Sequence, residues 1–256
     1  MIIVVPMAGR GVRFANMGYE IPKWMIRIFG KTILELSLSS VSNLPNITGY
    51  VFVINKDQMR QYDVRRVLDK FIRTEYVIVE VGTTEGQADT VFRARKYLYG
   101  QEVCIINCDN IVDSSLAEWC GKHAQVLPCL DLHKIPVNNP NQKSYAKVDR
   151  SDMVVKTAEK NPISHLVIAG VFYFRNFLTY VEAYEAMRSD GARVGGEFFI
   201  APMFNYLKDT RRIEVTRFFD LGEPATVEQF ILQQQFLPKE FQFLDRLGID
   251  YSKIGR

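Results

Sequence analysis

The sequence predicts a three-layer α/β fold, with a mixed central sheet between two layers of helices and a small antiparallel insertion. Three observations favour this fold. Short runs of β-branched residues recur without polar alternation, as in strands that are buried on both faces of a parallel sheet. Amphipathic helical patterns separate these runs in the first half of the chain, and a turn-linked pair of strands follows in the second half.

The first half of the chain supplies the parallel part of the sheet. The expected strands cover Ile2 to Val5, Tyr50 to Ile54, Tyr76 to Val79 and Val103 to Ile106. The first expected helix begins at Thr32, because Glu35 lies three residues later and completes a capping box. Two further amphipathic helices are expected over Gln58 to Arg73 and over Ala88 to Tyr99. Strand–helix units in this order predict right-handed crossovers.

The second half predicts shorter, antiparallel elements. A hairpin is expected with strands at Tyr145 to Val148 and Met153 to Lys156, joined by a turn at Asp149 to Asp152. The remaining expected elements are strands over Ile168 to Phe174 and Arg212 to Phe219, and helices over Asn176 to Arg188, after Gly196 and over Thr226 to Gln235. We expect one domain over residues 1–225 with a C-terminal helical segment over residues 226–256 packed on it, and the most mobile loop at Pro136 to Gln142.

Composition limits the class of protein. The 256 residues are 47% hydrophobic and 24% charged, which is ordinary for a globular domain. The net charge of +3, from 32 basic and 29 acidic residues, does not favour a nucleic-acid or membrane-surface binder. No signal-peptide pattern occurs and each apolar run is well short of the about twenty residues of a membrane-spanning helix, so we expect a cytoplasmic protein. The four cysteines lack C-x-x-C spacing and lie in apolar segments, which predicts buried thiols.

A glycine-containing turn directly follows the first expected strand. Gly9 and Gly11 lie within Pro6 to Phe14, and residues without side chains let backbone amides approach an anion. The cations in and after this turn are Arg10, Arg13 and Lys23. Because ligands of open α/β sheets bind at the carboxyl ends of the strands, the cluster predicts a phosphate-binding site. Its spacing does not match the G-x-G-x-x-G pattern of dinucleotide-binding folds, because Phe14 stands at the third glycine position. A P-loop at Gly30 to Thr32 is also excluded, because Met25 stands where that motif requires a glycine.

Two aspartates follow strands at the same edge of the predicted sheet. Asp109 comes after the strand that ends at Ile106, and Asp220 comes after the strand that ends at Phe219. Mg2+ usually binds one or two carboxylates together with substrate phosphates, so we expect these aspartates to hold Mg2+ beside the phosphate site. Either aspartate alone is equally suited to a helix cap or a turn.

Two further segments offer side chains for a second substrate. Glu159 and Lys160 lie side by side at the end of the expected hairpin, so an acid and a cation meet before a proline turn. Glu197 follows two glycines and precedes the apolar run Phe198 to Ile200. An acid in that position suits a hydroxyl acceptor at the wall of a pocket, and it equally suits the first turn of a helix.

Taken in order, these segments resemble the sugar-1-phosphate nucleotidyltransferases, or nucleoside-diphosphate-sugar pyrophosphorylases, through about Pro224. The resemblance rests on Ala8 to Phe14 with Pro22–Lys23, Gly86 to Thr90, Cys108 to Asn110, Glu159–Lys160, Ala169 to Phe172, Gly196–Glu197 and Phe219 to Gly222. It implies the Rossmann-like, glycosyltransferase A-like nucleotidyltransferase fold. It also implies an enzyme that condenses a nucleoside triphosphate with a phosphorylated small-molecule acceptor, a sugar 1-phosphate, and releases pyrophosphate.

The same resemblance implies a role for each matching residue. Nucleotide binding is implied for Met7, Ala8, Gly9, Gly11, Val12, Gly86, Gln87 and Asn107. The implied catalytic cations are Arg13, Lys23 and Lys160, the implied Mg2+ ligands are Asp109 and Asp220, and the implied sugar contacts are Glu159, Gly170 and Glu197. A phosphate monoester is mostly a dianion at pH 7 and needs no general base, which agrees with the absence of His123, His133 and His165 from the matching motifs.

Three residues depart from the family pattern. Val12 stands where the family has serine or threonine, Trp24 where it has a second proline, and Cys108 where it has glycine before the metal aspartate. The cradle sequence that begins Pro6–Met7 resembles a subgroup associated with bacterial capsule or surface-polysaccharide synthesis.

Other functions fit parts of the pattern. A cytidylyltransferase that acts on a non-sugar phosphate, such as phosphocholine or a phospho-amide, would share the cradle and differ only in the acceptor pocket. A glycosyltransferase of the same fold would use a D-x-D element, but Asp109 is followed by Asn110 and Ile111. A non-catalytic sugar-nucleotide sensor would tolerate Val12 and Trp24. The sequence leaves open the base, the acceptor and whether the chain forms a homo-oligomer.

Overall fold

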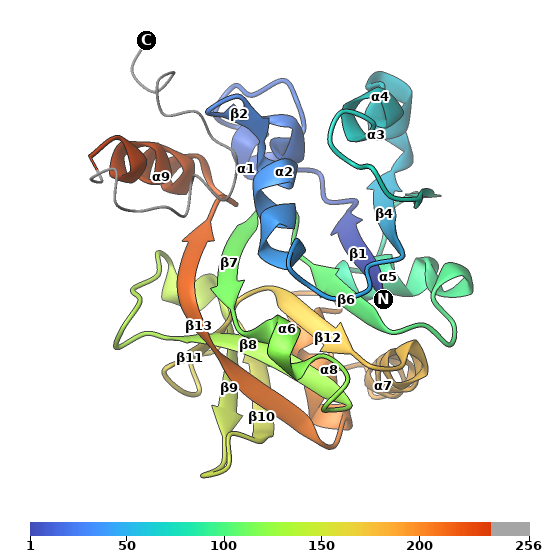
Figure 1. Ribbon diagram of the computed structural model, residues 1–256, viewed down its shortest axis with the longest axis vertical. Helices are drawn as coiled ribbons and strands as arrows, with labels where there is room; N and C mark the ends of the chain where they lie inside the picture. Colours follow the sequence, from blue (N-terminus) through green and yellow to red (C-terminus); the bar gives the residue numbers. More distant parts are fainter. Residues whose placement is uncertain (237–256) are drawn as a thin grey trace.

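The protein, described here by a computed structural model over residues 1–236, is built on one mixed sheet (Figure 1). The strands of this sheet are β1 (Ile2–Met7), β4 (Gly49–Asn55), β5 (Tyr76–Val81), β6 (Val103–Ile106), β7 (Asn110–Ser114), β8 (Gln125–Asp131), β9 (Ser144–Val148), β10 (Val154–Glu159), β11 (Leu166–Ile168), β12 (Val171–Phe174) and β13 (Thr210–Asp220). Their order is β10-β9-β11-β8-β12-β6-β1-β4-β5, with β13 beside β8 and β7. A separate small antiparallel sheet pairs β2 (Arg27–Ile28) with β3 (Lys31–Thr32).

The parallel part of the sheet confirms the prediction from the first half of the chain. β6, β1, β4 and β5 run parallel, with Val4 of β1 opposite both Val51 of β4 and Ile105 of β6. Successive residues of β1 enter different cores, since Ile3 packs on one face of the sheet and Val4 on the other. Both faces are therefore buried, which explains why these strands are continuously apolar in sequence.

Helices cover both faces of the sheet and complete the three layers. Their bounds are α1 (Val12–Ala15), α2 (Ile33–Leu38), α3 (Lys56–Gln61), α4 (Val64–Leu68), α5 (Gln87–Arg93), α6 (Leu116–Trp119), α7 (Phe177–Ser189), α8 (Ile200–Met203) and α9 (Pro224–Phe236). One core contains side chains of α2, α4 and α6, and the opposite core contains side chains of α5, α7 and α8. The predicted three-layer α/β class is confirmed.

Side-chain hydrogen bonds to backbone amides decide where α2 and α4 begin. At the start of α2, the Thr32 hydroxyl accepts a hydrogen bond from the Glu35 backbone amide at 3.1 Å, and the Glu35 carboxylate accepts one from the Thr32 amide at 2.7 Å. The single helix expected over 58–73 was wrong. Tyr62 is extended, and Asp63 starts a new helix, α4, by accepting a hydrogen bond from the Arg66 amide at 3.2 Å, because its short side chain competes for backbone donors.

The second half contains the predicted hairpin and two differences from expectation. β9 and β10 pair antiparallel as expected. The strand expected over 168–174 is two strands, because Gly170 has φ 76° and turns the chain from β11 into β12. β13 is longer than expected: its first residues pair parallel with β8 and its last pair antiparallel with β7 (Figure 1).

The C-terminal helix packs against the segment after the glycine turn. Val227 and Phe230 of α9 share a small apolar core with Phe14, Ile28 and Leu221. The remaining residues of the predicted C-terminal segment, 237–256, lie outside the described residues, and the domain boundary at 225 stays a prediction. The Pro136 to Gln142 segment is a loop with one short 3-10 turn at Pro140–Gln142.

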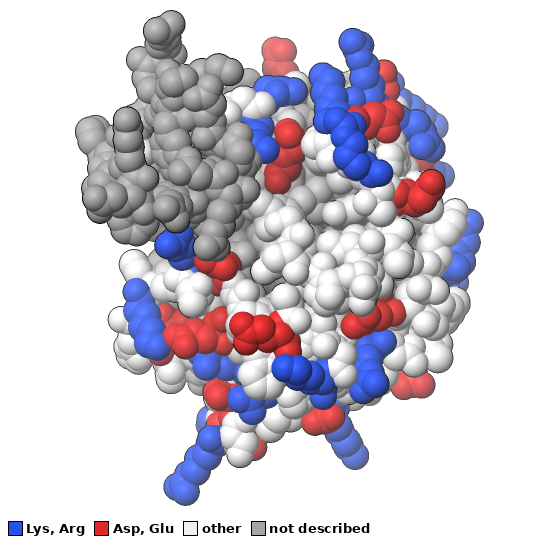
Figure 2. Space-filling view, in the orientation of Figure 1, with Lys and Arg blue, Asp and Glu red and all other residues white. Residues whose placement is uncertain are grey.

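The surface and the thiols agree with the composition. Lys and Arg side chains are interspersed with Asp and Glu on the face drawn in Figure 2. Cys104, Cys108 and Cys129 are buried free thiols and Cys120 is half-buried, so the prediction of buried thiols is confirmed for three of the four. Among the described residues, none of the helices has the length and apolar character that a membrane crossing requires.

Candidate active site

One cavity of about 840 Å3 opens at the carboxyl ends of β1, β4 and β6. It is lined by these predicted site residues: Ala8, Gly9, Val12, Arg13, Lys23, Gly86, Gln87, Asn107, Asp109, Glu159, Lys160, Gly170, Glu197 and Asp220. The remaining two, Met7 and Gly11, do not line it: Met7 is buried at the end of β1, and Gly11 lies in the turn beside it. Segments up to about two hundred residues apart in sequence thus meet at one edge of the sheet, where open α/β sheets bind ligands.

The glycine turn is held in place from outside the cavity. Gly11 has φ 63° and precedes α1, a conformation that glycine adopts without strain. The Gln58 side-chain amide donates a hydrogen bond to the Gly9 carbonyl at 3.1 Å, and the Trp24 indole N–H donates to the Gln58 side-chain oxygen at 3.1 Å. Trp24, which stands where the family has a second proline, is 1% exposed. This buried tryptophan therefore supports the glycine turn from the protein interior.

Each of the two predicted metal carboxylates forms an ion pair with a lysine. The Lys23 ammonium contacts Asp109, and the Lys143 ammonium contacts Asp220. Burial alone would lower the pKa of Lys23, but the attraction of Asp109, with smaller contributions from Cys108 and Asp220, raises the pKa overall. Lys23 is therefore a fixed positive charge within the cavity.

The two carboxylates also converge on one point. A Cβ atom added at Gly222 would lie 2.9 Å from Oδ2 of Asp109 and 2.9 Å from Oδ1 of Asp220. Because Gly222 has no side chain, the space between these two carboxylate oxygens is open. Oxygen atoms are the ligands that Mg2+ prefers. The residues present fit such an ion.

The Cys108 thiol lies directly before Asp109 and lines the cavity. Burial raises its pKa to about 11, against an opposing effect of Lys23. The thiol is neutral at physiological pH, so replacing the family's glycine by cysteine adds bulk here without adding charge.

Glycines bring three backbone segments close together on the α5 side of the cavity. Gly86 has φ 121°, and a Cβ atom there would lie 2.6 Å from the Phe198 carbonyl oxygen. The next residue, Gln87, donates a side-chain hydrogen bond to the Asn107 side-chain oxygen at 2.5 Å. The Asn107 backbone amide in turn donates to the Gly170 carbonyl at 2.8 Å. These residues form one connected polar wall.

The hairpin contributes an acid and a cation to the wall of the cavity. The Glu159 carboxylate is 8% exposed and accepts a hydrogen bond from the Ser144 hydroxyl. Burial raises the pKa of Glu159, an effect that Ser144 and Lys160 oppose. The Lys160 ammonium lies 4.7 Å from the centroid of the Phe199 ring, and Glu197 lines the same region of the cavity.

Sequence reasoning missed one charged residue of the cavity and one constraint on another. Lys143, which follows the Pro136 to Gln142 loop, lies in no recognisable motif and is 77 positions before Asp220 in the sequence. The sheet, which links β9 to β13 through β11 and β8, brings the two residues together. Arg13 is paired with Glu223 at 3.0 Å, which the sequence did not indicate. Both partners, Asp220 and Glu223, come from the segment where β13 leads into α9.

Comparison with known proteins identifies the family. Residues 1–194 match the family model described as IspD: 2-C-methyl-D-erythritol 4-phosphate cytidylyltransferase. A protein of that name from Vibrio atlanticus is 30% identical over 135 residues, which are 53% of this chain and 48% of that protein. The bifunctional protein GlmU of Methanococcus aeolicus is 26% identical over 179 residues, or 69% of this chain and 40% of its own length. The chain thus spans less than half of each of these two curated relatives.

Solved structures extend the likeness to most of the chain. A nucleoside-diphosphate-sugar pyrophosphorylase from Vibrio cholerae RC9 has a TM-score of 0.76 and 27% identity, covering 89% of this chain and 98% of its own. A glucose-1-phosphate thymidylyltransferase from Bacillus anthracis, described as putative in its own name, has a TM-score of 0.75 at 14% identity and covers 95% of this chain. At that identity, the second likeness supports the fold alone.

Proposed function

The chain belongs to the IspD family of cytidylyltransferases, and from this premise we propose that it transfers a nucleoside monophosphate from a nucleoside triphosphate to a phosphorylated, hydroxyl-rich acceptor, with release of pyrophosphate. The observation that carries the proposal is the cavity itself. A glycine turn, two lysine–carboxylate pairs and a buried acid beside a third lysine all line it. Membership of a nucleotidyltransferase family agrees with this set of residues.

We assign the nucleotide to the half of the cavity between the glycine turn and α5. Gly9 leaves its backbone open to phosphates, because nothing lies within 4 Å of a Cβ atom built there. Gln87 and Asn107 offer amide donors and acceptors for the base. Lys23 supplies positive charge for the triphosphate, and Arg13 adds to it from the rim of the cavity. Stabilising the negative charge of the transferred phosphoryl group is the main catalytic requirement of such a reaction.

We propose Asp109 and Asp220 as the carboxylates that hold Mg2+. When bound, the ion would neutralise phosphate charge and help to orient the triphosphate. The chain's own contribution is to aim both carboxylates at the gap beside Gly222. Lys23 and Lys143, which neutralise these carboxylates in the structure, are near enough to exchange them for phosphate oxygens when substrate enters.

We assign the acceptor to the wall formed by the hairpin and the segment after Gly196. Lys160 would bind the acceptor phosphate, and Glu159 and Glu197 would accept hydrogen bonds from acceptor hydroxyls. The phosphate oxygen then attacks the α-phosphorus, and the bond from that phosphorus to the β-phosphate oxygen breaks. A phosphate dianion carries no proton to remove, so positioning suffices.

A sugar 1-phosphate is the acceptor we favour, giving a nucleoside-diphosphate sugar. Support comes from the Vibrio cholerae pyrophosphorylase, which is 27% identical and covers 89% of this chain. The family model favours a second candidate, cytidylyl transfer to a polyol phosphate. A role in surface-polysaccharide synthesis, a cytoplasmic location and homo-oligomer formation stay predictions from the sequence.

Pyrophosphate release by the purified protein tests this proposal. Each nucleoside triphosphate is combined with Mg2+ and a panel of sugar 1-phosphates and polyol phosphates. We expect one triphosphate and one acceptor class to give turnover that chelation of Mg2+ abolishes. Release with CTP and a polyol phosphate alone would select the second candidate, and binding of sugar nucleotides without pyrophosphate release would indicate a glycosyltransferase or a sensor.

Variants of the Lys23–Asp109 pair sharpen the test. Lys23→Gln should lower turnover by at least about a hundredfold, because one charge-stabilising donor is typically worth that much. Lys208→Gln removes an exposed lysine outside the cavity and should leave turnover unchanged. Normal turnover of a folded Lys23→Gln or Asp109→Asn variant would contradict the assignment of this pair.

A further inference from the structure

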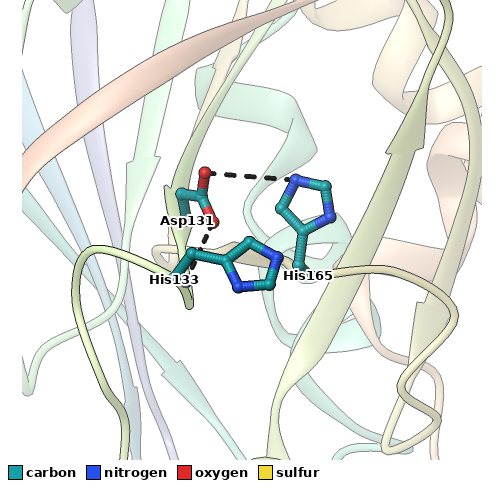
Figure 3. Close-up of side chains that lie close together, drawn as sticks. All are labelled: Asp131, His133 and His165. Atoms are coloured by element: carbon teal, nitrogen blue, oxygen red, sulfur yellow. Dashed lines mark hydrogen bonds and ion pairs between the residues drawn. The ribbon is translucent and has the colours of Figure 1, made fainter.

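Three side chains of types that ligate metals lie close together outside the lining of the cavity (Figure 3). Asp131 is the last residue of β8, and His133 follows it by two residues. His165 directly precedes β11, whose residue Leu166 pairs with Asp131 in the antiparallel ladder. The ladder therefore brings His165 beside Asp131, although 33 residues separate them in sequence.

Backbone hydrogen bonds fix all three residues. The Leu132 amide donates to the His165 carbonyl at 3.0 Å, which joins the two segments. The His133 amide donates to Oδ1 of Asp131 at 3.0 Å, and the Lys134 and Ile135 amides donate to the Asp131 carbonyl at 2.9 Å. Only side-chain rotation remains for these residues to bind one ion.

The side chains already face one another. One ligand atom from each lies within 4.8 Å of the other two, and the two imidazole rings are 4.9 Å apart between centroids. Nε2 of His165 lies 4.0 Å from Oδ2 of Asp131, which is too long for a hydrogen bond. With metal–ligand distances of about 2.0–2.2 Å, ligand atoms of a tetrahedral site are roughly 3.4 Å apart. A contraction of about 1.5 Å by two exposed histidine side chains reaches that geometry.

The local charges favour a cation. Asp131 contributes a carboxylate, of which Oδ1 already accepts the hydrogen bond from the His133 amide. The neighbouring lysine, Lys134, is drawn away because its ammonium is paired with Glu214 at 2.6 Å. The ammonium of Lys134 therefore does not occupy Oδ2 of Asp131, which faces the His165 imidazole at 4.0 Å.

We propose that Asp131, His133 and His165 bind a divalent transition-metal ion, with Zn2+ as the best match. Two imidazoles with one carboxylate suit Zn2+ better than Mg2+ or Ca2+, which prefer oxygen ligands alone. Both histidines are exposed, so water completes the coordination. The site is separate from the proposed Mg2+ site and does not depend on the proposed function.

The position of this site indicates what the ion does. Between His133 and His165 the chain forms the loop and the hairpin that carry Lys143, Glu159 and Lys160 to the cavity. An ion bound to residues at both ends of this segment closes it as a loop, which restricts its freedom in the unfolded and partly opened states. The ion therefore has a structural role: it stabilises the segment between His133 and His165, which carries residues of the proposed acceptor site.

Zinc titration of the chelator-treated, full-length protein tests whether this site binds Zn2+. Calorimetry should show one Zn2+ site whose affinity falls at least about tenfold in His133→Asn and in His165→Asn. Asp131→Asn should weaken binding as well, while its Oδ1 still accepts the His133 amide and preserves the turn. At a hundredfold excess over Kd, Zn2+ should raise the Tm of the unaltered protein by about 5 °C or more.

Two matched controls separate this site from others. His123→Asn changes the third histidine, whose ring lies 5.4 Å from Trp119, and should bind Zn2+ as the unaltered protein does. Asp109→Asn should lose transferase activity and keep this zinc site. Zinc binding that survives both His133→Asn and His165→Asn, or no zinc binding by the unaltered protein, would overturn the proposal.

Discussion

Gly170→Ala adds a single methyl group where β11 turns into β12, and its two effects can be separated. Gly170 has φ 76°, and an alanine in this left-handed region costs about 1–2 kcal/mol. The new Cβ atom would also lie 2.5 Å from the side-chain nitrogens of Asn107 and Asn110. Forcing atoms into such a packed position costs about 1–3 kcal/mol more. The expected loss in the free energy of unfolding is therefore about 2–5 kcal/mol.

Gly191→Ala is the matched control for the backbone effect. Gly191 has a similar φ of 64°, and nothing lies within 4 Å of a Cβ atom built there. It should lose only the backbone contribution of about 1–2 kcal/mol. The gain from a stiffer unfolded chain applies to both alanine variants and cancels in their difference. The difference of about 1–3 kcal/mol thus isolates the contact with the two asparagines.

Urea unfolding of the two variants and the unaltered protein measures these losses. The midpoint should shift with little change in the slope, and the Tm values of the two variants should differ by about 2–12 °C. Asn107 also bonds to Gln87, so Gly170→Ala should raise the KM for the triphosphate, whereas Gly191→Ala should not. Equal losses of stability in the two variants would refute the argument from close approach.

Two further substitutions probe the acid of the acceptor wall and the support of the glycine turn. Because burial raises the pKa of Glu159 in the folded protein, ionisation of this carboxyl lowers the free energy of unfolding as the pH rises through that pKa. Glu159→Gln should therefore become more stable relative to the unaltered protein between pH 4 and pH 7, as measured by urea unfolding at both pH values. The same difference in unfolding free energy at both pH values would contradict this. Trp24→Phe keeps a buried ring but removes the indole donor to Gln58, whose side-chain amide donates to the Gly9 carbonyl. It should lower the free energy of unfolding by about 1–3 kcal/mol and raise the KM for the triphosphate. An unchanged KM would mean that the conformation of the glycine turn does not depend on Trp24.

Local patterns in the sequence were enough to predict the core elements and the general edge of the site. The continuous apolar runs of β1 and β4 reflect burial on both faces, and the Thr32–Glu35 capping box involves residues only three apart. The glycine turn with its cations is likewise local, so its place after the first strand was predictable. The helix over 58–73 was one exception, because Asp63 can either stay within a helix or start a new one, and periodicity does not distinguish the two.

Contacts between distant segments could not be predicted from such patterns. Lys143 and Asp220 are 77 positions apart in the sequence, and they meet because the sheet links β9 to β13 through β11 and β8. The lack of room for a side chain at Gly170 is due to Asn107 and Asn110, which lie about sixty residues earlier in the chain.

The sequence by itself thus determined the fold class, the position of the glycine turn and the residue types of the cavity, because these depend on periodicity and on hydrogen bonds within a few residues. The tertiary structure decided which charges meet. Asp109 and Asp220 converge on Gly222, and His165 comes to lie beside Asp131, because strand pairing fixes the positions of residues that are far apart in sequence.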